Sequence, residues 1–370
     1  MKLRYKVTAG IFILAVICIS VFSVMLSHNA ACPPATSRAL NGDSMQAVVY
    51  PCYGSADVLR LETIEKPVPA DNEVLVKIKA AGVNPLDWHY MRGSPYIMRV
   101  GTGLGAPNET RLGVDFAGTI EAVGKNVTKY KPGDDVFGGG TGAFADYLSI
   151  AEDRGMALKP DNLSFEQAAA VPIAAITALQ AVRNKGQLKP GQKVLINGAS
   201  GGVGTFAVQI ASLIGAEVTG VCSARNADMV RLIGADHVID YKTENYTQSG
   251  KKYDLIIDMI GNHSLSDNRQ VLTPEGKFVI IGGGKGNWLG PLMGPLKASL
   301  YSPFVAQDFV LLMAQMRKDD LETLADLMSA GEITPVIDRL YSLEEVPEAI
   351  RYSEEGHARG KIVIQIEQPQ

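Results

Sequence analysis

The hydrophobic pattern of the chain begins with one long apolar stretch. No Asp, Glu, Lys or Arg occurs from Val7 to Ser37, and the centre of this stretch, Ala9 to Leu26, is mostly apolar. A helix of that length would span about 27 Å, close to the ~30 Å hydrocarbon core of a bilayer. This predicts an N-terminal transmembrane helix and a membrane location. Three basic residues precede this stretch, Lys2, Arg4 and Lys6. Under the positive-inside rule they would stay in the cytoplasm, which would place the globule on the other side of the membrane.

Two other interpretations of this segment remain open. The run could be a cleaved signal peptide, although such signals usually have an apolar region of ~7–15 residues and a small-x-small cleavage site. Ala30-Ala31-Cys32 resembles the end of a lipoprotein signal, with Asn29 where such signals usually carry Leu. Residues Cys32 to Gly42 contain Pro, Ser and Gly and are typical of a linker.

A β-rich region follows the linker from about Met45. In Glu73 to Lys79, apolar residues stand at every second position: Val74, Val76 and Ile78. Alternation with a period of two predicts a strand with one buried face. Gly and Pro interrupt the chain repeatedly up to about Gly142, so the first domain is predicted to consist mainly of strands.

The pattern changes again after Ser164. An Ala-rich stretch, Phe165 to Val182, predicts a helix. Short apolar strands then alternate with helices, the strands being Lys193–Ile196, Glu217–Val221, Asp254–Ile257 and Lys277–Ile281. Strands that are apolar throughout and alternate with helices predict a parallel sheet covered on both faces. The fold class is therefore α/β, with a final helix at Asp320–Ala330 and a final strand at Lys361–Ile366.

Composition and charge narrow the function classes. The 370 residues, enough for about two domains, include 35 Lys and Arg against 39 Asp and Glu, giving a net charge of −4. A nucleic-acid-binding domain is usually basic, so we expect no nucleic-acid partner. The cysteines are too few and too scattered for a disulfide framework or a Cys-x-x-Cys metal site: Cys18, Cys32, Cys52 and Cys222.

A glycine-rich loop carries the strongest functional signal. The apolar strand Val194–Ile196 runs into Asn197 and then into the loop, and a helix begins near Val203. In a strand–loop–helix unit, glycines let backbone N–H groups approach a pyrophosphate, and the helix N-terminus favours its charge. The candidate cofactor-binding residues of the loop are Gly198, Ala199, Ser200, Gly201, Gly202, Val203 and Gly204.

The end of the next strand favours NADP(H) over NAD(H). An Asp or Glu there would bind the ribose hydroxyls of NAD, but the chain instead has Ser223 and Arg225. Arginine binds a phosphate bidentately, which suits the 2′-phosphate of NADP. Tyr241, after the following strand, could close over the same phosphate. The alternative role for Arg225 is an exposed residue at the start of a helix.

These motifs resemble the medium-chain dehydrogenase/reductase superfamily. The resemblance rests on Gly198 to Gly204, on Gly113-Val114-Asp115-Phe116-Ala117-Gly118 and on Val123-Gly124, and it is strongest to the zinc-free quinone oxidoreductase and enoyl reductase branch. The resemblance covers roughly Met45 to Ile366, so residues 1–44 are left as the anchor and linker. It implies a GroES-like catalytic domain in 45–167 and a Rossmann NADP-binding domain in 168–305. Residues 306–370 would return to the catalytic domain, and the protein would be a homodimer.

The resemblance also implies a metal-free site. Zinc-dependent members of the superfamily carry Cys or His at positions where this chain has Asn84, Val114 and Ala174. Two of these three residues are aliphatic, whereas catalytic zinc needs three N, S or O ligands from the protein. Without a metal to stabilise charge on oxygen, a quinone or a conjugated C=C such as an enone is easier to reduce than an isolated carbonyl. We therefore expect an NADPH-dependent oxidoreductase with a hydrophobic substrate of that kind.

The same resemblance implies further site residues. Asn84 would lie beside the reacting carbonyl, and Tyr90 and Tyr96 are the candidate proton donors. Cofactor contacts are implied for Thr177, Gly282, Gly283 and Lys361. Separately, the apolar segment Asn287 to Phe304 looks like a lid, which could line a hydrophobic substrate site, form a dimer contact or lie on the bilayer. Because neither tyrosine is in register with the family pattern, a non-catalytic, membrane-associated protein that binds NADPH remains the alternative.

Overall fold

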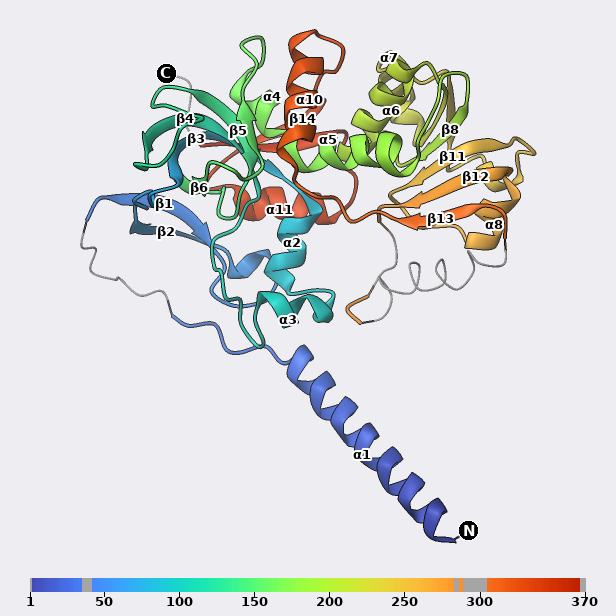
Figure 1. The fold of residues 1–370 in the computed structure, drawn as a ribbon, viewed down its shortest axis with the longest axis horizontal. Coiled ribbons are helices and arrows are strands. Elements are labelled where there is room, and N and C mark those ends of the chain that lie inside the picture. Colours follow the sequence, from blue (N-terminus) through green and yellow to red (C-terminus); the bar gives the residue numbers. More distant parts are fainter. Residues whose placement is uncertain (1, 35–41, 283–285, 289–304, 367–370) are drawn as a thin grey trace.

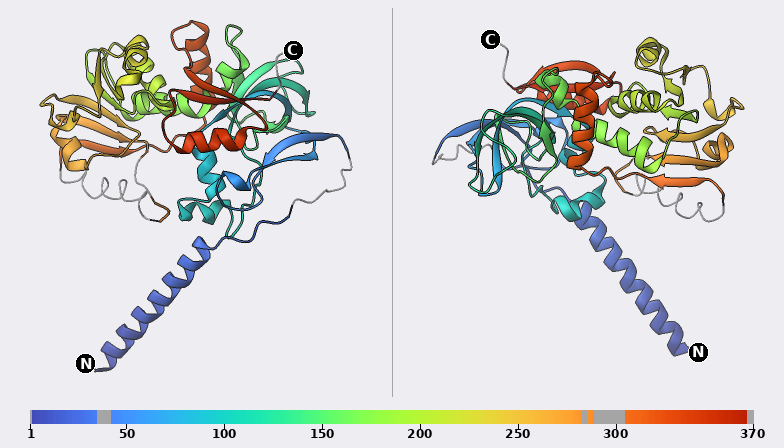
Figure 2. Two further views of the ribbon diagram at one scale, coloured as in Figure 1. Left: turned by 180° about the vertical axis from the view of Figure 1, so that it is seen from behind. Right: turned by 45° about the horizontal axis from the view of Figure 1, so that its top comes forward.

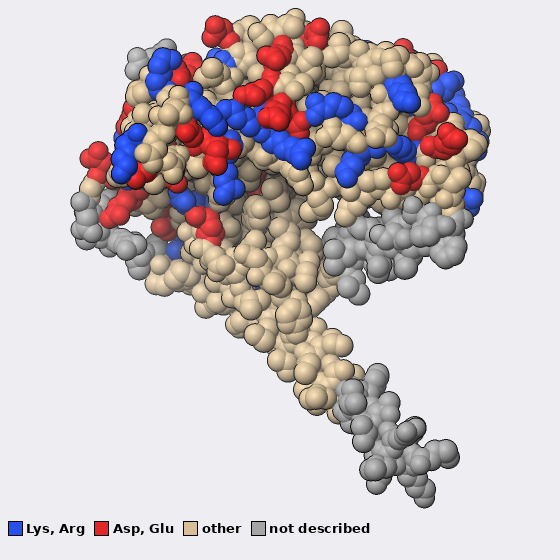
Figure 3. Space-filling model, viewed as in Figure 1, with Lys and Arg blue, Asp and Glu red and all other residues tan. Residues whose placement is uncertain are grey.

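The structure is a computed structural model that describes residues 2–34, 42–282, 286–288 and 305–366, with side chains from residue 13 onward. The first helix, α1 (Lys2–Ser27), extends away from the rest of the molecule (Figure 1, Figure 3). Across the residues that could be searched, no helix is both long and apolar enough to cross a membrane. The prediction of an N-terminal transmembrane helix is therefore not supported.

Two sheets in the described residues build the β-rich part. Strands β1 (Ser44–Val49) and β2 (Arg60–Glu65) pair antiparallel. The larger sheet has seven strands, with the order β14-β15-β3-β4-β5-β7 and β6 paired to β3. Its strands are β3 (Glu73–Val83), β4 (Asp115–Val123), β5 (Asp135–Gly139), β6 (Tyr147–Ala151), β7 (Met156–Leu158), β14 (Ile337–Ser342) and β15 (Lys361–Gln365).

The alternation that predicted β3 corresponds to its packing. Val74 and Val76 are completely buried, and Ile78 is nearly so, in the core of this sheet. The short helices α2 (Pro85–Arg92), α3 (Arg99–Thr102) and α11 (Val346–Glu354) belong to the same part of the molecule.

The second part is a six-stranded parallel sheet. Its strands in sequence are β8 (Lys193–Asn197), β9 (Glu217–Cys222), β10 (His237–Asp240), β11 (Tyr253–Asp258), β12 (Leu272–Ile280) and β13 (Asp308–Leu311). Among the described residues their order is β10-β9-β8-β11-β12-β13. This is the doubly wound order, in which ligands bind where the order reverses, here between β8 and β11.

Helices flank this sheet and connect it to the β-rich part (Figure 1). They are α4 (Phe165–Ala169), α5 (Pro172–Leu179), a π-helical turn (Gln180–Lys185), α6 (Gly202–Ile214), α7 (Ala227–Leu232), α8 (Leu265–Gln270) and α10 (Lys318–Ser329). The single helix predicted over Phe165–Val182 is interrupted between α4 and α5. Pro172 explains the break, because proline has no N–H to continue a helix and fits its first turn.

The chain returns to the β-rich sheet after β13. There, β15 pairs parallel with β14 and antiparallel with β3, so that Ile362 lies opposite Val83. Gly360, the residue before β15, bridges to Gly201 in the glycine-rich loop. The C-terminal elements, red in Figure 2, therefore join the two parts of the molecule at the loop.

One disulfide fastens the N-terminal segment. Cys32 and Cys52 are bonded, with Cα atoms 5.1 Å apart, within the usual range for a disulfide. Four scattered cysteines predict no disulfide framework. This single bond was not predicted, because Cys32 and Cys52 come together only through the fold. Cys18 and Cys222 are free.

Candidate active site

The glycine-rich loop has the geometry of a phosphate-binding turn. Gly198 has φ = +97°, a conformation that L-residues with a Cβ rarely adopt. A Cβ on Gly204 would overlap the carbonyl oxygen of Gly198, so the first turn of α6 and the loop approach each other more closely than alanine allows. The N-terminus of α6 at Gly202 thus presents its free N–H groups at the end of β8.

A polar network lies at the switch point between β8 and β11. Asn197, at the end of β8, is buried, and its Nδ2 donates to Oδ1 of Asp258 and Oδ1 of Asn262, both at 2.9 Å. The same Asp258 oxygen accepts the backbone N–H groups of Ile260 and Gly261 at 2.9 and 3.0 Å. These bonds fix the two strand ends beside the glycine-rich loop.

The residues expected at an adenosine phosphate gather at the neighbouring strand ends. Ser223 and Arg225 follow β9, and Tyr241 follows β10, where its N–H donates to the Cys222 carbonyl at 3.2 Å. Arg225 Nη2 donates to the carbonyl of His357 at 2.9 Å. Asn226 links this edge to the loop through a 3.0 Å bond from Nδ2 to Ser200 Oγ. The structure thus brings the predicted phosphate-contacting residues together at one rim.

A buried polar cluster, Asn84–Asp115–Lys361, lies on the other side of the loop. Asn84 stands between β3 and α2, Asp115 begins β4 and Lys361 begins β15. Lys361 Nζ donates to Asn84 Oδ1 at 2.6 Å and to the Val83 carbonyl at 3.0 Å, and it lies 3.5 Å from Asp115 Oδ2. Asn84 Nδ2 donates to Asp115 Oδ2 at 2.9 Å. The cluster therefore links β4 and β15 to the residue that follows β3.

The cluster also contacts the dinucleotide-binding half. Asp115 Oδ1 accepts the N–H of Ile173 in the first turn of α5 at 3.1 Å, and Thr177, one turn later, donates to the Ile173 carbonyl at 2.6 Å. The N–H of Gly360 donates to the Ser200 carbonyl at 2.9 Å. Lys361 therefore extends from beside the glycine-rich loop to Asn84. Gly282 follows β12, and Gly283 lies outside the described residues.

Burial shifts the pKa values of the charged side chains in this region. Asp87, in the first turn of α2, is fully buried, and this burial raises its pKa to about 8. Its Oδ2 accepts the Asn84 N–H at 2.7 Å, whereas Oδ1 has no hydrogen-bond partner within the described residues. Burial likewise raises the pKa of Asp115 and lowers that of Lys361, and the charge of each opposes the shift of the other.

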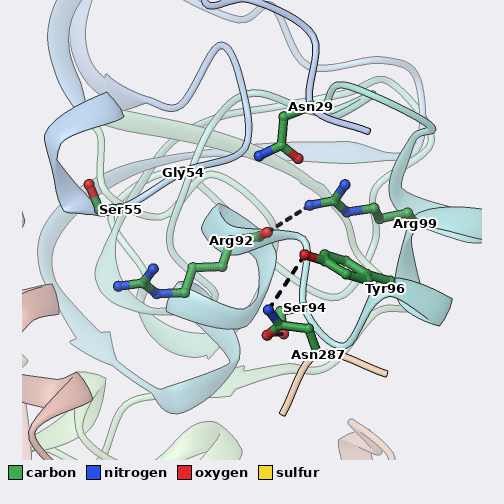
Figure 4. A pocket seen from close by; sticks show the side chains of 8 residues that line it. All are labelled: Asn29, Gly54, Ser55, Arg92, Ser94, Tyr96, Arg99 and Asn287. Carbon is green, nitrogen blue, oxygen red and sulfur yellow. Dashed lines mark hydrogen bonds between the residues drawn. The ribbon is translucent and has the colours of Figure 1, made fainter. Parts of the chain in front are cut away.

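The two candidate proton donors lie in different surroundings. Tyr96 lines a cavity of about 180 Å³, and Asn287 Nδ2 donates to its hydroxyl at 3.5 Å (Figure 4). The cavity is lined by Asn29, Gly54, Ser55, Arg92, Ser94, Tyr96, Arg99 and Asn287. Tyr90 instead packs, half-buried, against the core of the β-rich sheet. Most of the predicted lid, residues 289–304, lies outside the described residues.

Sequence reasoning missed the acidic members of this site. Asp87 could have been found from its position three residues after Asn84, the spacing of a capping box. Asp115 was quoted in a motif but given no role, because its contacts with Asn84 and Lys361 depend on strand pairing. Over the ranges that the structure describes, no three His, Cys, Asp or Glu side chains form a group that could hold a metal.

Two family models match the chain. Residues 70–161 match the alcohol dehydrogenase GroES-like domain, and residues 233–364 match a zinc-binding dehydrogenase domain. The chain is 35% identical over 343 residues to the chloroplastic quinone-oxidoreductase QR1 of Triphysaria versicolor, covering 88% of this chain and 99% of that protein.

A second relative and a solved structure agree with these matches. The mitochondrial NAD(P)H oxidoreductase RTN4IP1 of Bos taurus is 33% identical over 365 residues, covering 87% of this chain and 89% of the relative. The structure of the quinone oxidoreductase from Coxiella burnetii superposes with a TM-score of 0.78 at 28% identity. The superposition covers 88% of this chain and all of the Coxiella burnetii chain. The matches confirm the expected GroES-like domain, and the fold is shared over 88% of the chain.

Proposed function

The chain belongs to the medium-chain dehydrogenase/reductase superfamily, in its quinone oxidoreductase-like branch, and on that basis we propose that it reduces a quinone or a conjugated C=C with NADPH and without a metal. The observation that carries this proposal is the position of Lys361. Its side chain connects the glycine-rich loop to the Asn84–Asp115–Lys361 cluster, and so couples the nucleotide-binding turn to the polar centre of the β-rich part.

The residues at the loop fit a dinucleotide. The Gly198–Gly204 turn leaves room for a pyrophosphate at the N-terminus of α6. At the adjoining rim, Ser223 and Arg225 supply a hydroxyl and a cation, and the acidic Asp240 at the end of β10 accepts the N–H of Lys242 at 3.1 Å. Of these groups, the Ser223 hydroxyl and the Arg225 guanidinium favour a ribose that carries a 2′-phosphate. NADPH, when bound, supplies the hydride.

The buried cluster would orient the substrate. Both N–H groups of the Asn84 amide are donated, one to Asp115 at 2.9 Å and one to the Gly82 carbonyl at 3.3 Å. The bond to Gly82 is the longer one, so we infer that this N–H is shared with a substrate oxygen, while Asp115 and Lys361 hold the planar amide in its orientation. This explains how Asn84 can polarise a conjugated carbonyl without a metal.

Of the two tyrosines, we assign the role of proton donor to Tyr96, because its hydroxyl borders a cavity that we take as the substrate site. There it would hold a proton at Oη for the carbon or oxygen that becomes negative. Tyr90 contributes to the core instead. The Asn84, Val114 and Ala174 side chains stand where zinc-dependent relatives carry ligands, and two of them offer no donor atom. The metal-free character of the site is part of the proposal.

The test is oxidation of NADPH followed by its absorbance, with a panel of ortho- and para-quinones and enones. We expect saturable turnover with at least one of them, and loss of turnover and of NADPH binding in Gly204→Val, whose side chain would overlap Gly198. Gly101→Ala is the matched control, since its Cβ would meet nothing within 4 Å. Tight NADPH binding with no turnover would instead favour a non-catalytic NADPH-binding protein.

A further inference from the structure

Arg99 is a buried arginine whose described hydrogen-bond acceptors are all backbone carbonyls. It begins α3, and 1% of it is exposed. Its guanidinium donates to the carbonyls of Gly93 at 2.7 Å, Leu26 at 2.9 Å, His28 at 3.0 Å and Arg92 at 3.1 Å. Because a buried charge is costly, these carbonyl dipoles must offset the desolvation of the guanidinium.

Two tyrosine rings flank the same guanidinium. The carbon Cζ of Arg99 lies 4.4 Å from the ring centroid of Tyr53 and 4.5 Å from that of Tyr96. Both distances lie in the range of a cation–π contact, which strengthens when the cation is desolvated. Figure 4 shows Arg99 beside Tyr96, whose hydroxyl points into the cavity toward Asn287. Arg99 thus fixes the ring of a residue on the cavity wall.

The acceptors from Leu26 and His28 belong to the segment that we name the N-terminal strap, residues 26–34. Its first residues end α1, which packs against the 3₁₀ turn Tyr96–Met98. The strap is held to the β-rich part by the N–H of Ala30, which donates to the Gly105 carbonyl at 2.8 Å, and by the Cys32–Cys52 disulfide. Cys52 directly precedes Tyr53, the other ring on Arg99.

We propose that Arg99 is a positioning residue that holds Tyr96 on the wall of the cavity, and that the N-terminal strap completes the carbonyl site in which the Arg99 guanidinium is held. Through Asn29 the strap is itself part of the cavity wall, although it lies outside the β-rich sheet and the parallel sheet. The role of Tyr96 rests on the proposed function. The position of Tyr96 does not, and so it can be tested separately.

The test compares Arg99→Lys with wild type by two measurements. Lysine keeps the charge but cannot reach four carbonyls in the fork geometry of a guanidinium. In a Trp88→Phe background the sole tryptophan is Trp288, whose ring lies edge-on to Tyr96 with centroids 4.9 Å apart. Quenching of its emission by acrylamide therefore reports on the position of Tyr96. Turnover is measured in parallel, with Arg351→Lys, an exposed arginine paired with Asp57 and Glu348, as the control.

We expect Arg99→Lys to increase quenching of Trp288 and to lower kcat about tenfold or more, since misplacement of a reacting group by ~1 Å can cost ~10²-fold. The Kd of NADPH should stay unchanged. In a Tyr96→Phe background, Arg99→Lys should lower kcat little further, because Arg99 acts through Tyr96. A purely structural arginine would lower kcat equally in both backgrounds, and that result, or unchanged quenching of Trp288, would overturn the proposal.

A second variant covers the case in which Arg99→Lys does not fold. Cys32→Ser opens the disulfide at its exposed end and leaves Arg99 in place. It should change Trp288 quenching and kcat in the same direction by a smaller factor, and unchanged values would count against the proposal. If wild type turns over no quinone or enone, the proposed function fails, and Trp288 quenching alone decides whether Arg99 positions Tyr96.

Discussion

The ammonium group of Lys361 lies 2.6 Å from the amide oxygen of Asn84, a residue 277 positions earlier in the sequence. This contact joins the first residue of β15 to the residue that precedes α2. Asp115 completes the group at 3.5 Å from the same ammonium. All three side chains are buried. If one of them is removed, water cannot take its place as a partner for the other two.

The buried pair predicts a large loss of stability in Lys361→Met. The variant leaves the Asp115 carboxylate without its cation, and breaking a buried pair in this way costs about 3–5 kcal/mol. Urea unfolding should show this loss as a lower midpoint with an unchanged slope. The double variant Lys361→Met with Asp115→Asn should recover much of it, whereas strictly additive losses would mean that the two residues do not interact.

Asp87 predicts a specific dependence of stability on pH. Its pKa is about 8 in the folded protein because of burial, against about 3.9 for an unfolded aspartate. Between these values the folded state binds the additional proton, so the contribution of Asp87 to stability falls as the pH rises from about 4 to about 8.

Asp87→Asn should remove this contribution. The variant is expected to unfold at a higher urea concentration than wild type at pH 8.5 and at a similar one at pH 4, since the Asn oxygen can still accept the Asn84 N–H. Urea titrations at several pH values measure the difference. An equal gain at every pH would show that Asp87 is ionised throughout.

Arg225 predicts the choice of cofactor. If its guanidinium binds the 2′-phosphate, Arg225→Ala should weaken NADPH binding by about 2–3 kcal/mol, the scale of a charge-assisted hydrogen bond with charge pairing. The affinity for NADH should change little. Arg231→Ala is the matched control, because Arg231 pairs with Asp228 on α7 instead. Equal losses for both nucleotides, measured by calorimetry, would exclude this role for Arg225.

The proposed site is expected to work without a metal, and this is simple to measure. Because Val114 and Ala174 offer no ligand atoms, activity should survive extended dialysis against a strong chelator. Elemental analysis should then find no stoichiometric zinc. One zinc per chain, lost together with activity, would show that the site uses ligands other than these positions.

Local patterns predicted much of this molecule. The alternation of Val74, Val76 and Ile78 indicated β3, and the strand–glycine–helix order indicated the loop at Gly198–Gly204, because both features are set by neighbouring residues. The alternation of strands and helices indicated the parallel sheet for the same reason.

Contacts between distant segments were not predictable in this way. Nothing near Asp115 in the sequence points to Lys361, since the two meet only when β15 pairs with β3 and β3 with β4. The Cys32–Cys52 bond and the hydrogen bond from Arg99 to the Leu26 carbonyl also join residues that are distant in the sequence. The apolar N-terminal run was assigned to a membrane from composition and length alone, and the structure does not support that assignment.

The place of β15 in the sheet sets the order in which this protein can be assembled during synthesis. The N-terminal part of a chain leaves the ribosome first and begins to fold while the rest is still being made. Until Lys361 emerges, β3 is paired along Ala80–Gly82 with β4 alone and lacks β15 on its other edge, and the buried Asp115 lacks its cation. Because Lys361 lies 277 positions after Asn84, the Asn84–Asp115–Lys361 cluster can form only after nearly all of the intervening domains have been made. A nascent chain stalled before β15 would therefore hold the nucleotide-binding loop without a completed active site.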